Sequence, residues 1–123
     1  MFFNTFVSTI FAAAFLAGTT HATPIARSGF SGDATFFNPG LGACGANSVD
    51  SDHIVALSPS EFASGARCFQ HIGVHANGQF VDATVVDLCL GCASGSIDLS
   101  PSAFGVLADL SVGRLHGVTW DFE

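Results

Sequence analysis

Residues 85–104 read VVDLCLGCASGSIDLSPSAF, and this stretch is the most informative part of the chain for the fold. It begins at the end of an apolar, β-branched segment, continues through a loop rich in Gly and Ser that contains two cysteines, and ends in a helix start. Ser100 is placed to cap that helix, and Pro101 takes its first position, where a missing N–H costs nothing. Phe104 and the apolar residues after it then face inward. A buried strand, a loop and a short helix are therefore expected in succession.

Two aspartates mark the ends of the loop. Asp87 lies where the apolar strand enters the loop, and Asp98 lies just before the helix start. Both side chains can project from one end of a small barrel, and two carboxylates that face one groove suit acid–base work on a glycosidic bond. The structural interpretation is the more common one for an aspartate beside a turn. In that interpretation Asp87 ties down its loop, and Asp98 accepts hydrogen bonds from the free N–H groups of the helix start.

Segments on both sides of this stretch predict a mainly β protein. The strand candidates are residues 34–37, 53–57, 68–74, 79–86 and 115–122. Residues 58–62 predict one or two helical turns, and residues 87–96 predict a loop. Asn77 and Gly78 stand between two apolar segments, which is a strong signal for a tight hairpin. Many short strands with Gly-rich loops and two brief helices are typical of a small β-barrel.

The N-terminal segment differs in composition from the rest of the chain. Residues 1–18 contain no charged side chain, and residues 6–16 form an apolar run of signal-peptide length that is followed by small and polar residues. A membrane-spanning helix needs about 20 apolar residues, so this run is too short to be one. We therefore expect residues 1–22 to be a signal peptide, residues 23–31 a flexible leader, and residues 32–123 one secreted, extracellular domain.

The charge balance of the expected mature domain is strongly acidic. It keeps all ten Asp and Glu residues and has three basic residues and no Lys, so its formal net charge is −7. So few cations cannot neutralise a run of phosphates or attach the protein to anionic lipid, and we expect neither a nucleic-acid partner nor membrane attachment. The acidic balance also works against strongly anionic polysaccharides. Neutral polymers remain suitable partners, and we expect a monomer.

The cysteines of the chain favour disulfides over a metal site. They are Cys44, Cys68, Cys89 and Cys92. Four cysteines in a small secreted chain indicate two disulfides, with three possible pairings. Only Cys89 and Cys92 have C-x-x-C spacing, whereas a structural zinc site usually needs two such pairs, and no βαβ pattern indicates a redox motif. His71 and His75 are four residues apart, but in a strand-like segment this spacing does not place them on one helix face. We therefore expect no metal and no cofactor.

Five motifs occur in order along the chain and resemble one known family. They are ATFF at 34–37, GACG at 42–45, VDLCLGC at 86–92, IDLSPSAF at 97–104 and GRLHGVTW at 113–120. Together they resemble the double-psi β-barrel of expansins and of the single-domain loosenins, a group that also includes barwin-like and rare-lipoprotein-A-like domains. The resemblance covers about residues 32–123. It implies a mainly β, six-stranded barrel with one or two short helices, stapled by disulfides.

The same resemblance implies which residues form the site. Thr35, Asp87 and Asp98 would line a polysaccharide-binding groove, and Asp98 matches the acid on which loosening activity depends. Phe36 and Phe37 alternate across a strand, so one should face the core, and Phe37 is our candidate for the groove. The implied disulfides join Cys44 to Cys68 and Cys89 to Cys92.

The chain also departs from its relatives in ways that bear on activity. Family 45 glycoside hydrolases have a second catalytic Asp shortly after the first strand, and residues 35–39 offer no carboxylate there. An inverting hydrolase needs both an acid and a base, so ordinary hydrolysis is not expected. Cys89 stands where some expansins have an aromatic groove residue. Aromatic side chains are the usual platform for sugars, but the chain has no Tyr and its single Trp, Trp120, is expected in the core. We therefore expect weak binding of polysaccharide.

Three functions follow as hypotheses. The first is a secreted, expansin-like protein that binds cell-wall polysaccharide, cellulose or chitin, and loosens it without hydrolysis. The second is an enzyme that resembles lytic transglycosylases, which use a single Asp, so that Asp98 would be catalytic. The third is a protein-binding role, as a protease inhibitor or a secreted effector, in which the groove acid is incidental.

Overall fold

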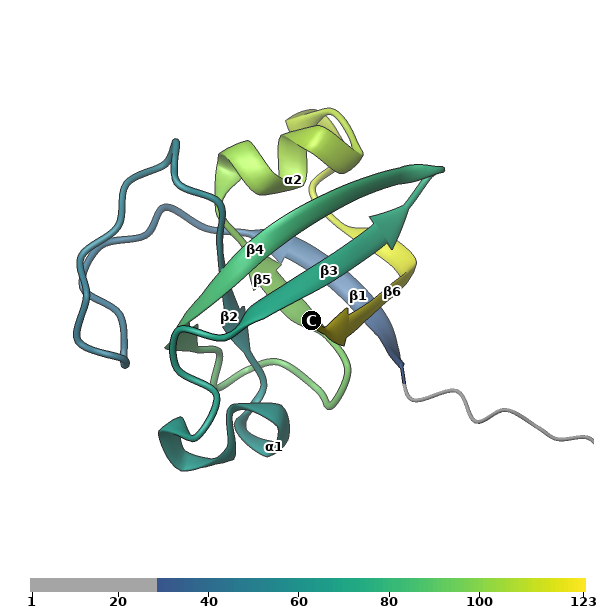
Figure 1. Ribbon diagram of the computed structural model, residues 1–123. Coiled ribbons are helices and arrows are strands. Elements are labelled where there is room, and N and C mark those ends of the chain that lie inside the picture. The colour runs from purple at the N-terminus through teal and green to yellow at the C-terminus, as the bar shows by residue number, and fades with distance from the viewer. Residues whose placement is uncertain (1–28) are drawn as a thin grey trace, which may run out of the picture.

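The structure is a computed structural model that describes residues 29–123, so the expected signal peptide and most of the expected leader lie outside the described residues. In this part of the chain six strands form a closed barrel (Figure 1). They are β1 (Phe30–Phe36), β2 (Ile54–Leu57), β3 (His71–Ala76), β4 (Gln79–Leu88), β5 (Ile97–Leu99) and β6 (Leu115–Phe122). The predicted mainly β, six-stranded double-psi barrel is confirmed.

Strands that are distant in sequence are neighbours in the barrel. Their order around it is β1-β5-β2-β4-β3-β6. β1 pairs in parallel with β5, and β2 in parallel with β4, whereas the other four pairings are antiparallel. Because the barrel closes between β1 and β6, every strand has two neighbours and no strand edge is left open.

Short helices cover the two ends of the barrel (Figure 1). Between β2 and β3 lie α1 (Pro59–Phe62) and the 3-10 turn η2 (Ala63–Gly65), and between β5 and β6 lie α2 (Pro101–Leu107) and the 3-10 turn η3 (Leu110–Val112). The predicted cap of the second helix is confirmed, because Ser100 Oγ accepts a hydrogen bond from the amide of Ala103. Among residues 29–123, no helix combines the length and apolar character needed to cross a membrane.

The barrel interior is filled by alternate strand residues, as the pleat requires. Its fully buried side chains include Val55, Leu57, Ile72, Val85, Ile97, Leu99, Phe104 and Trp120. The expected core position of Trp120 is confirmed: its side chain is 2% exposed, and its indole N–H donates to the carbonyl of Gly95 at 2.8 Å. This bond ties the last strand to the loop that precedes β5.

Strand β1 begins earlier than the sequence indicated. We expected residues 23–31 to be a flexible leader, but β1 starts at Phe30, where it pairs with Trp120 on β6. The rings of Phe30 and Trp120 stack with their centroids 4.4 Å apart. This aromatic contact explains the early start, because it gives the first residue of the strand a buried partner.

The hairpin is as predicted, but the start of β3 is not. Asn77 and Gly78 connect β3 and β4 and both have positive φ, as a tight hairpin turn requires. We expected the first of these strands to begin at residue 68, whereas it begins at His71. Phe69, with a φ of 68°, interrupts the extended backbone before that point.

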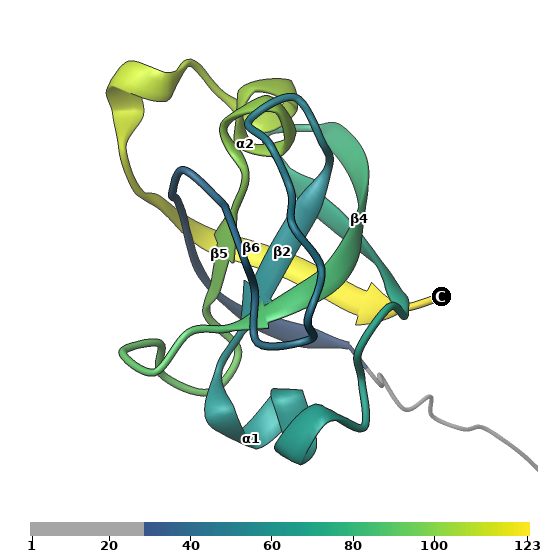
Figure 2. The same ribbon diagram turned by 90° about the vertical axis from the view of Figure 1, so that its left-hand side faces the viewer.

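The loop between β1 and β2 lies against the outside of the barrel (Figure 2). Its Cys44 amide donates to the carbonyl of Val86 on β4 at 3.1 Å, and a disulfide joins Cys44 to Cys68. Gly42 is required at this contact, because a Cβ there would collide with the carbonyl of Val86. The second disulfide joins Cys89 to Cys92, so the pairing is the one that the family resemblance implies.

Candidate functional site

Four residues lie in register across the outer face of β1, β5, β2 and β4. Thr35 pairs with Asp98, Asp98 with Ala56, and Ala56 with Asp87. Strand neighbours such as Ala34, Val55 and Ile97 are buried inside the barrel, so the side chains of this row point outward. Ala56 is nevertheless 2% exposed, which shows that the outer face is covered at that position. The fold therefore places Thr35, Asp98 and Asp87 on one face.

Asp98 is the half-buried carboxyl group at the centre of this row. Thr35 Oγ1 donates a hydrogen bond to Asp98 Oδ1 at 3.0 Å. Burial raises the pKa of Asp98; the Thr35 hydroxyl and the charge of Arg114 oppose this rise, and the charge of Asp87 adds to it. The resulting carboxyl group holds its proton more readily than an exposed aspartate does.

The structure corrects the structural interpretation of Asp98. That interpretation made Asp98 an acceptor for the N–H groups of helix α2, but Ser100 caps the helix and Asp98 belongs to strand β5. The sequence analysis did not predict β5, because a strand of three residues next to a helix start gives too short a pattern. Asp98 is therefore oriented by β1 and β5 and not by the helix.

Asp87 has the loop-anchoring role that its sequence context favoured. It belongs to β4, which extends to Leu88, and so lies in a strand rather than in the predicted loop 87–96. Its Oδ1 accepts hydrogen bonds from the amide of Ala43 at 2.9 Å and from its own neighbour Leu88 at 2.8 Å. Asp87 therefore holds the β1–β2 loop against the barrel and contributes negative charge near Asp98.

A hollow with a volume of about 410 Å³ lies beside Thr35. It is lined by Asp33, Thr35, Cys89, Gly91, Cys92, Ala93, Ser96, Ile97 and Arg114. The Cys89–Cys92 disulfide forms part of its wall, so the loop that borders the hollow is stapled. The lining mixes charged, hydroxyl and small apolar groups, and such a lining suits a ligand that presents many hydroxyl groups.

Asp33 is a residue of this hollow that the sequence analysis missed. It accepts a hydrogen bond from Arg114 Nη1 at 3.0 Å, and its other oxygen lies 3.0 Å from His116 Nδ1. The contacts with His116 and then Arg114 lower the pKa of Asp33. The strand period could have found this residue, because Asp33 stands two positions before Thr35 and alternation puts both on one side. Arg114 and His116, which lie in the GRLHGVTW motif, carry no such signal.

Phe36, the last residue of β1, and Phe37, which follows it, have different surroundings. Phe36 packs against Phe104 of α2, with ring centroids 5.0 Å apart, and so faces the core. Phe37 is half-buried, and its amide donates to the carbonyl of Leu99 at 2.9 Å. Phe37 is not among the residues that line the hollow beside Thr35. The hollow itself therefore offers hydrogen-bonding groups and no aromatic platform.

Comparison with known proteins places these features among relatives. No protein-family model matches the chain. The Allergen Asp f 7 of Aspergillus fumigatus is 35% identical over 114 residues, which cover 80% of this chain and 42% of the allergen. Its homolog in Arthroderma benhamiae is 34% identical over an alignment of 128 positions, and the match covers 85% of this chain and 43% of that protein. The chain thus spans less than half the length of these two fungal relatives.

A bacterial relative matches over a larger share of its length. The Papain inhibitor of Streptomyces mobaraensis is 32% identical over 99 residues, which cover 74% of this chain and 69% of the inhibitor. The solved Streptomyces papain inhibitor superposes with a TM-score of 0.70 and 30% identity, covering 82% of this chain and 98% of the inhibitor chain.

Solved structures of a Clavibacter michiganensis expansin are also similar. The apo form gives a TM-score of 0.71 and 29% identity, and covers 77% of this chain and 50% of the expansin. A variant of the expansin in complex with cellohexaose gives the same TM-score and coverages with 26% identity. The chain therefore resembles the papain inhibitor and half of the expansin to a similar degree.

Proposed function

We propose that this chain, which belongs to the double-psi β-barrel family that includes the Streptomyces papain inhibitor, is a secreted, expansin-like protein. In this proposal it binds neutral cell-wall polysaccharide. In this proposal the outer face of β1 and β5 holds a β-linked polymer, cellulose or chitin, and loosens the contacts between its chains without hydrolysis. The two disulfides support a secreted, extracellular protein, since such bonds persist in oxidising compartments.

The observation that carries this proposal is the outward-facing pair of Thr35 and Asp98 beside the hollow. When it is ionised, this half-buried carboxylate can accept hydrogen bonds from the hydroxyl groups of a sugar. Thr35 holds this carboxyl group in place through its own hydroxyl. The expansin that binds cellohexaose supports the choice of a neutral glucan as the first polymer to test.

Binding without hydrolysis is supported by the nature of the second carboxylate. Asp33 is the carboxylate that lines the hollow, and its contacts with His116 and Arg114 lower its pKa. A carboxylate with a lowered pKa is a weak base, so it activates water poorly. Asp33 is therefore a poor candidate for the base that an inverting hydrolysis would need beside Asp98.

The test is a pull-down of the protein on cellulose, chitin and peptidoglycan, with soluble fragments and reducing ends measured in the same samples. We expect the wild type to bind cellulose or chitin. We expect Asp98→Asn to bind about tenfold less tightly, because a charged carboxylate accepts stronger hydrogen bonds from sugar hydroxyls than an amide oxygen does. Asp109→Asn is the matched control, because Asp109 lies at the start of η3 and bonds to Ser111.

Failure to bind any of the three polymers would defeat the proposal. Soluble fragments that are released by the wild type and not by Asp98→Asn would instead support an enzyme that uses a single Asp, as lytic transglycosylases do.

Inhibition of a papain-like protease is the second candidate function. It is favoured by a specific observation, since the chain covers 98% of the solved papain inhibitor at 30% identity. The test is the residual activity of papain with increasing amounts of the protein. Full activity at a large molar excess would exclude this function, and inhibition retained in Asp98→Asn would separate it from the polysaccharide groove.

A further inference from the structure

A second group of polar side chains lies on the side of the barrel opposite Asp98. Asp98 belongs to β5, and β3 is three strands away from β5 in either direction around the barrel. His71 is the first residue of β3, Asp82 lies in β4, and Glu123 directly follows β6. Three adjacent strands thus bring these residues together, although His71 is 11 positions and Glu123 is 41 positions from Asp82 in the sequence.

The three side chains converge on one point. The distance from His71 Nδ1 to Asp82 Oδ1 is 2.7 Å, and one donor atom from each of the three residues lies within 4.8 Å of the other two. Backbone pairing holds this arrangement, because the Glu123 amide donates to the His71 carbonyl at 3.0 Å. The cluster is therefore positioned by the sheet and does not depend on a flexible loop.

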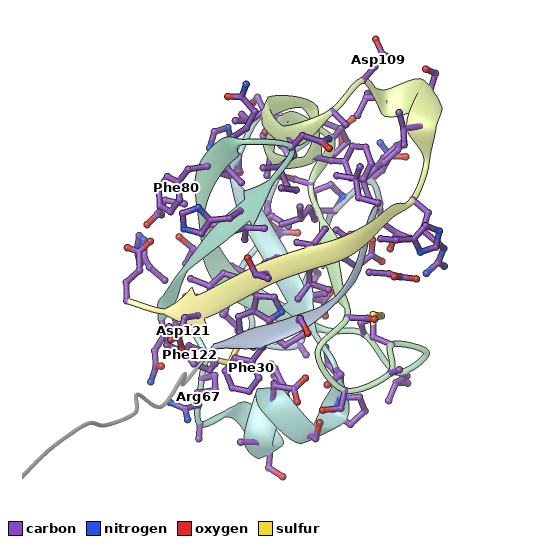
Figure 3. The ribbon with its side chains drawn as sticks, turned by 90° about the vertical axis from the view of Figure 1, so that its right-hand side faces the viewer. Phe30, Arg67, Phe80, Asp109, Asp121 and Phe122 are labelled. Carbon is purple, nitrogen blue, oxygen red and sulfur yellow. A yellow bond between two sulfur atoms is a disulfide. The ribbon has the colours of Figure 1, made fainter. Side chains whose placement is uncertain are left out.

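Gly73 makes room for the cluster at its centre. It pairs with Asp82 on one side and with Asp121 on the other. A Cβ on Gly73 would lie 2.7 Å from the ring of Phe80 and 3.0 Å from Glu123 Oε2, so a larger residue would push the Glu123 carboxylate away. The surface above Gly73 is a hollow of about 510 Å³ to which Asp82 and Glu123 contribute. Figure 3 shows Phe80 and Asp121 on this face of the barrel.

The donor set has the chemistry of a site for a divalent transition-metal ion. One imidazole nitrogen and two carboxylate oxygens suit Zn²⁺, whereas Ca²⁺ and Mg²⁺ prefer oxygen ligands alone. Asp82 forms an ion pair with His71, and the Glu123 carboxyl group lies beside Asp82. Two ionised carboxylates this close repel each other. The chain has no Lys that could supply a further positive charge. A divalent cation would satisfy both carboxylates at once.

We propose that His71, Asp82 and Glu123 form a binding site for a divalent transition-metal ion such as Zn²⁺. Three protein ligands leave at least one coordination position open toward the hollow above Gly73. Water, or a donor group of a partner molecule, would take that position. This site is independent of the proposed polysaccharide groove, since it shares no residue with it.

The test is a calorimetric titration of Zn²⁺ into the full, disulfide-oxidised protein after treatment with a chelator. We expect one Zn²⁺ to bind per chain, and we expect His71→Ala, Asp82→Asn and Glu123→Gln each to weaken the affinity about tenfold or more. His75→Ala is the matched control, because His75 lies four residues after His71 on the same strand and outside the cluster. Thermal unfolding in the presence of chelator checks that each variant folds.

The outcomes separate clearly. The absence of Zn²⁺ binding to the folded wild type, an affinity of His71→Ala within twofold of the wild type, or an equal loss in His75→Ala would each overturn the proposal. Titrations with Mg²⁺ and with Ca²⁺ should show weaker binding than Zn²⁺, and tighter binding of either would overturn the choice of a transition metal. Asp98→Asn should bind Zn²⁺ normally, since its carboxyl group faces the other side of the barrel.

Discussion

Glu61 and Asp98 are two carboxyl groups withdrawn from solvent, and they differ in the hydrogen-bond donors around them. Glu61 accepts hydrogen bonds from the hydroxyls of Ser58, Ser60 and Ser94, and from the Gly95 amide at 2.8 Å. Burial raises the pKa of Glu61, but these four donors outweigh it and hold the pKa below its ordinary value. Among residues 29–123, Asp98 accepts a side-chain hydrogen bond from Thr35, and its pKa is raised. Glu61 is thus built for stability, and Asp98 remains available to a ligand.

Replacing Glu61 with Gln should destabilise the fold. The groups around Glu61 all donate hydrogen bonds, and the Gln amide would place a second donor against one of them. At least one hydrogen bond is then lost, and we expect this to cost about 1–3 kcal/mol in the free energy of unfolding. Denaturant titration at neutral pH measures this cost. Glu123→Gln, at the other glutamate of the chain, should change the stability by less than about 0.5 kcal/mol in chelator, as exposed substitutions do. Equal effects of the two substitutions would contradict the role of Glu61.

The cost of Glu61→Gln should also depend on pH. Because the folded state lowers the pKa of Glu61 below its ordinary value of 4.5, the ionised carboxylate contributes stability that is complete above that value and is lost as the pH falls through the folded pKa. The wild type and the variant should therefore converge in stability in strong acid. A difference in stability between wild type and variant that widens in acid would contradict the lowered pKa of Glu61.

Asp98→Asn should have the opposite effect on stability. The folded state raises the pKa of Asp98, so it keeps a proton that the unfolded chain has lost, and stability falls as the pH rises from the ordinary value of 3.8 through the folded pKa. Asn resembles the neutral carboxyl group and can still accept from Thr35. The variant should therefore be more stable than the wild type at neutral pH and equal to it below 3.8. Denaturant titrations at the two pH values measure this; a loss of stability at neutral pH would contradict it.

At the scale of elements, strong local signals predicted most of the barrel. The hairpin at Asn77 and Gly78, the cap at Ser100 and the last strand at 115–122 follow from turn chemistry, capping and alternation, which act over a few residues. β5 and the early start of β1 could not be predicted in this way. Both depend on partners far away in sequence, as Phe30 depends on Trp120.

The candidate site likewise contains residues that the sequence predicted and residues that it did not. Thr35, Asp87 and Asp98 were predicted from the motifs of a known family, and the barrel places them in one row. Asp33 was missed because the side chains that contact its carboxylate lie 81 or more positions away in the sequence. The cluster around His71 was missed because its members are 11 or more positions apart. Side-chain contacts over such separations leave no periodic signal in a single sequence.

The two disulfides should contribute unequally to stability. The Cys44–Cys68 bond closes a loop with a sequence separation of 24, and the Cys89–Cys92 bond one with a separation of 3. Loop-closure entropy then gives about 3.5 kcal/mol for the first and about 2 kcal/mol for the second. We expect the Cys44→Ser/Cys68→Ser pair of substitutions to lower the free energy of unfolding more than Cys89→Ser/Cys92→Ser. Denaturant titration compares them, and a larger loss from the short bridge would contradict this order.

For the whole molecule, the formal net charge of −7 should decide which polymers are excluded. Of the three basic residues, Arg114 is paired with Asp33, and Arg67 lies over the ring of Phe122 at 4.2 Å. We therefore expect the protein to pass through a heparin column at low salt without retention. We also expect binding to a neutral β-glucan to change by less than about twofold between low and physiological salt, since few ions are released. Retention on heparin would reveal a basic patch that the charge balance hides.

The pairing of β1 with β6 has a consequence for how the protein is made. The first strand of the barrel lies between β5 and β6, so neither of its partners exists until the ribosome has passed residue 97. Contacts between residues so distant in sequence form slowly during folding. β1 therefore has no strand partner while the middle of the barrel is being made, and the barrel closes only once β6 has left the ribosome.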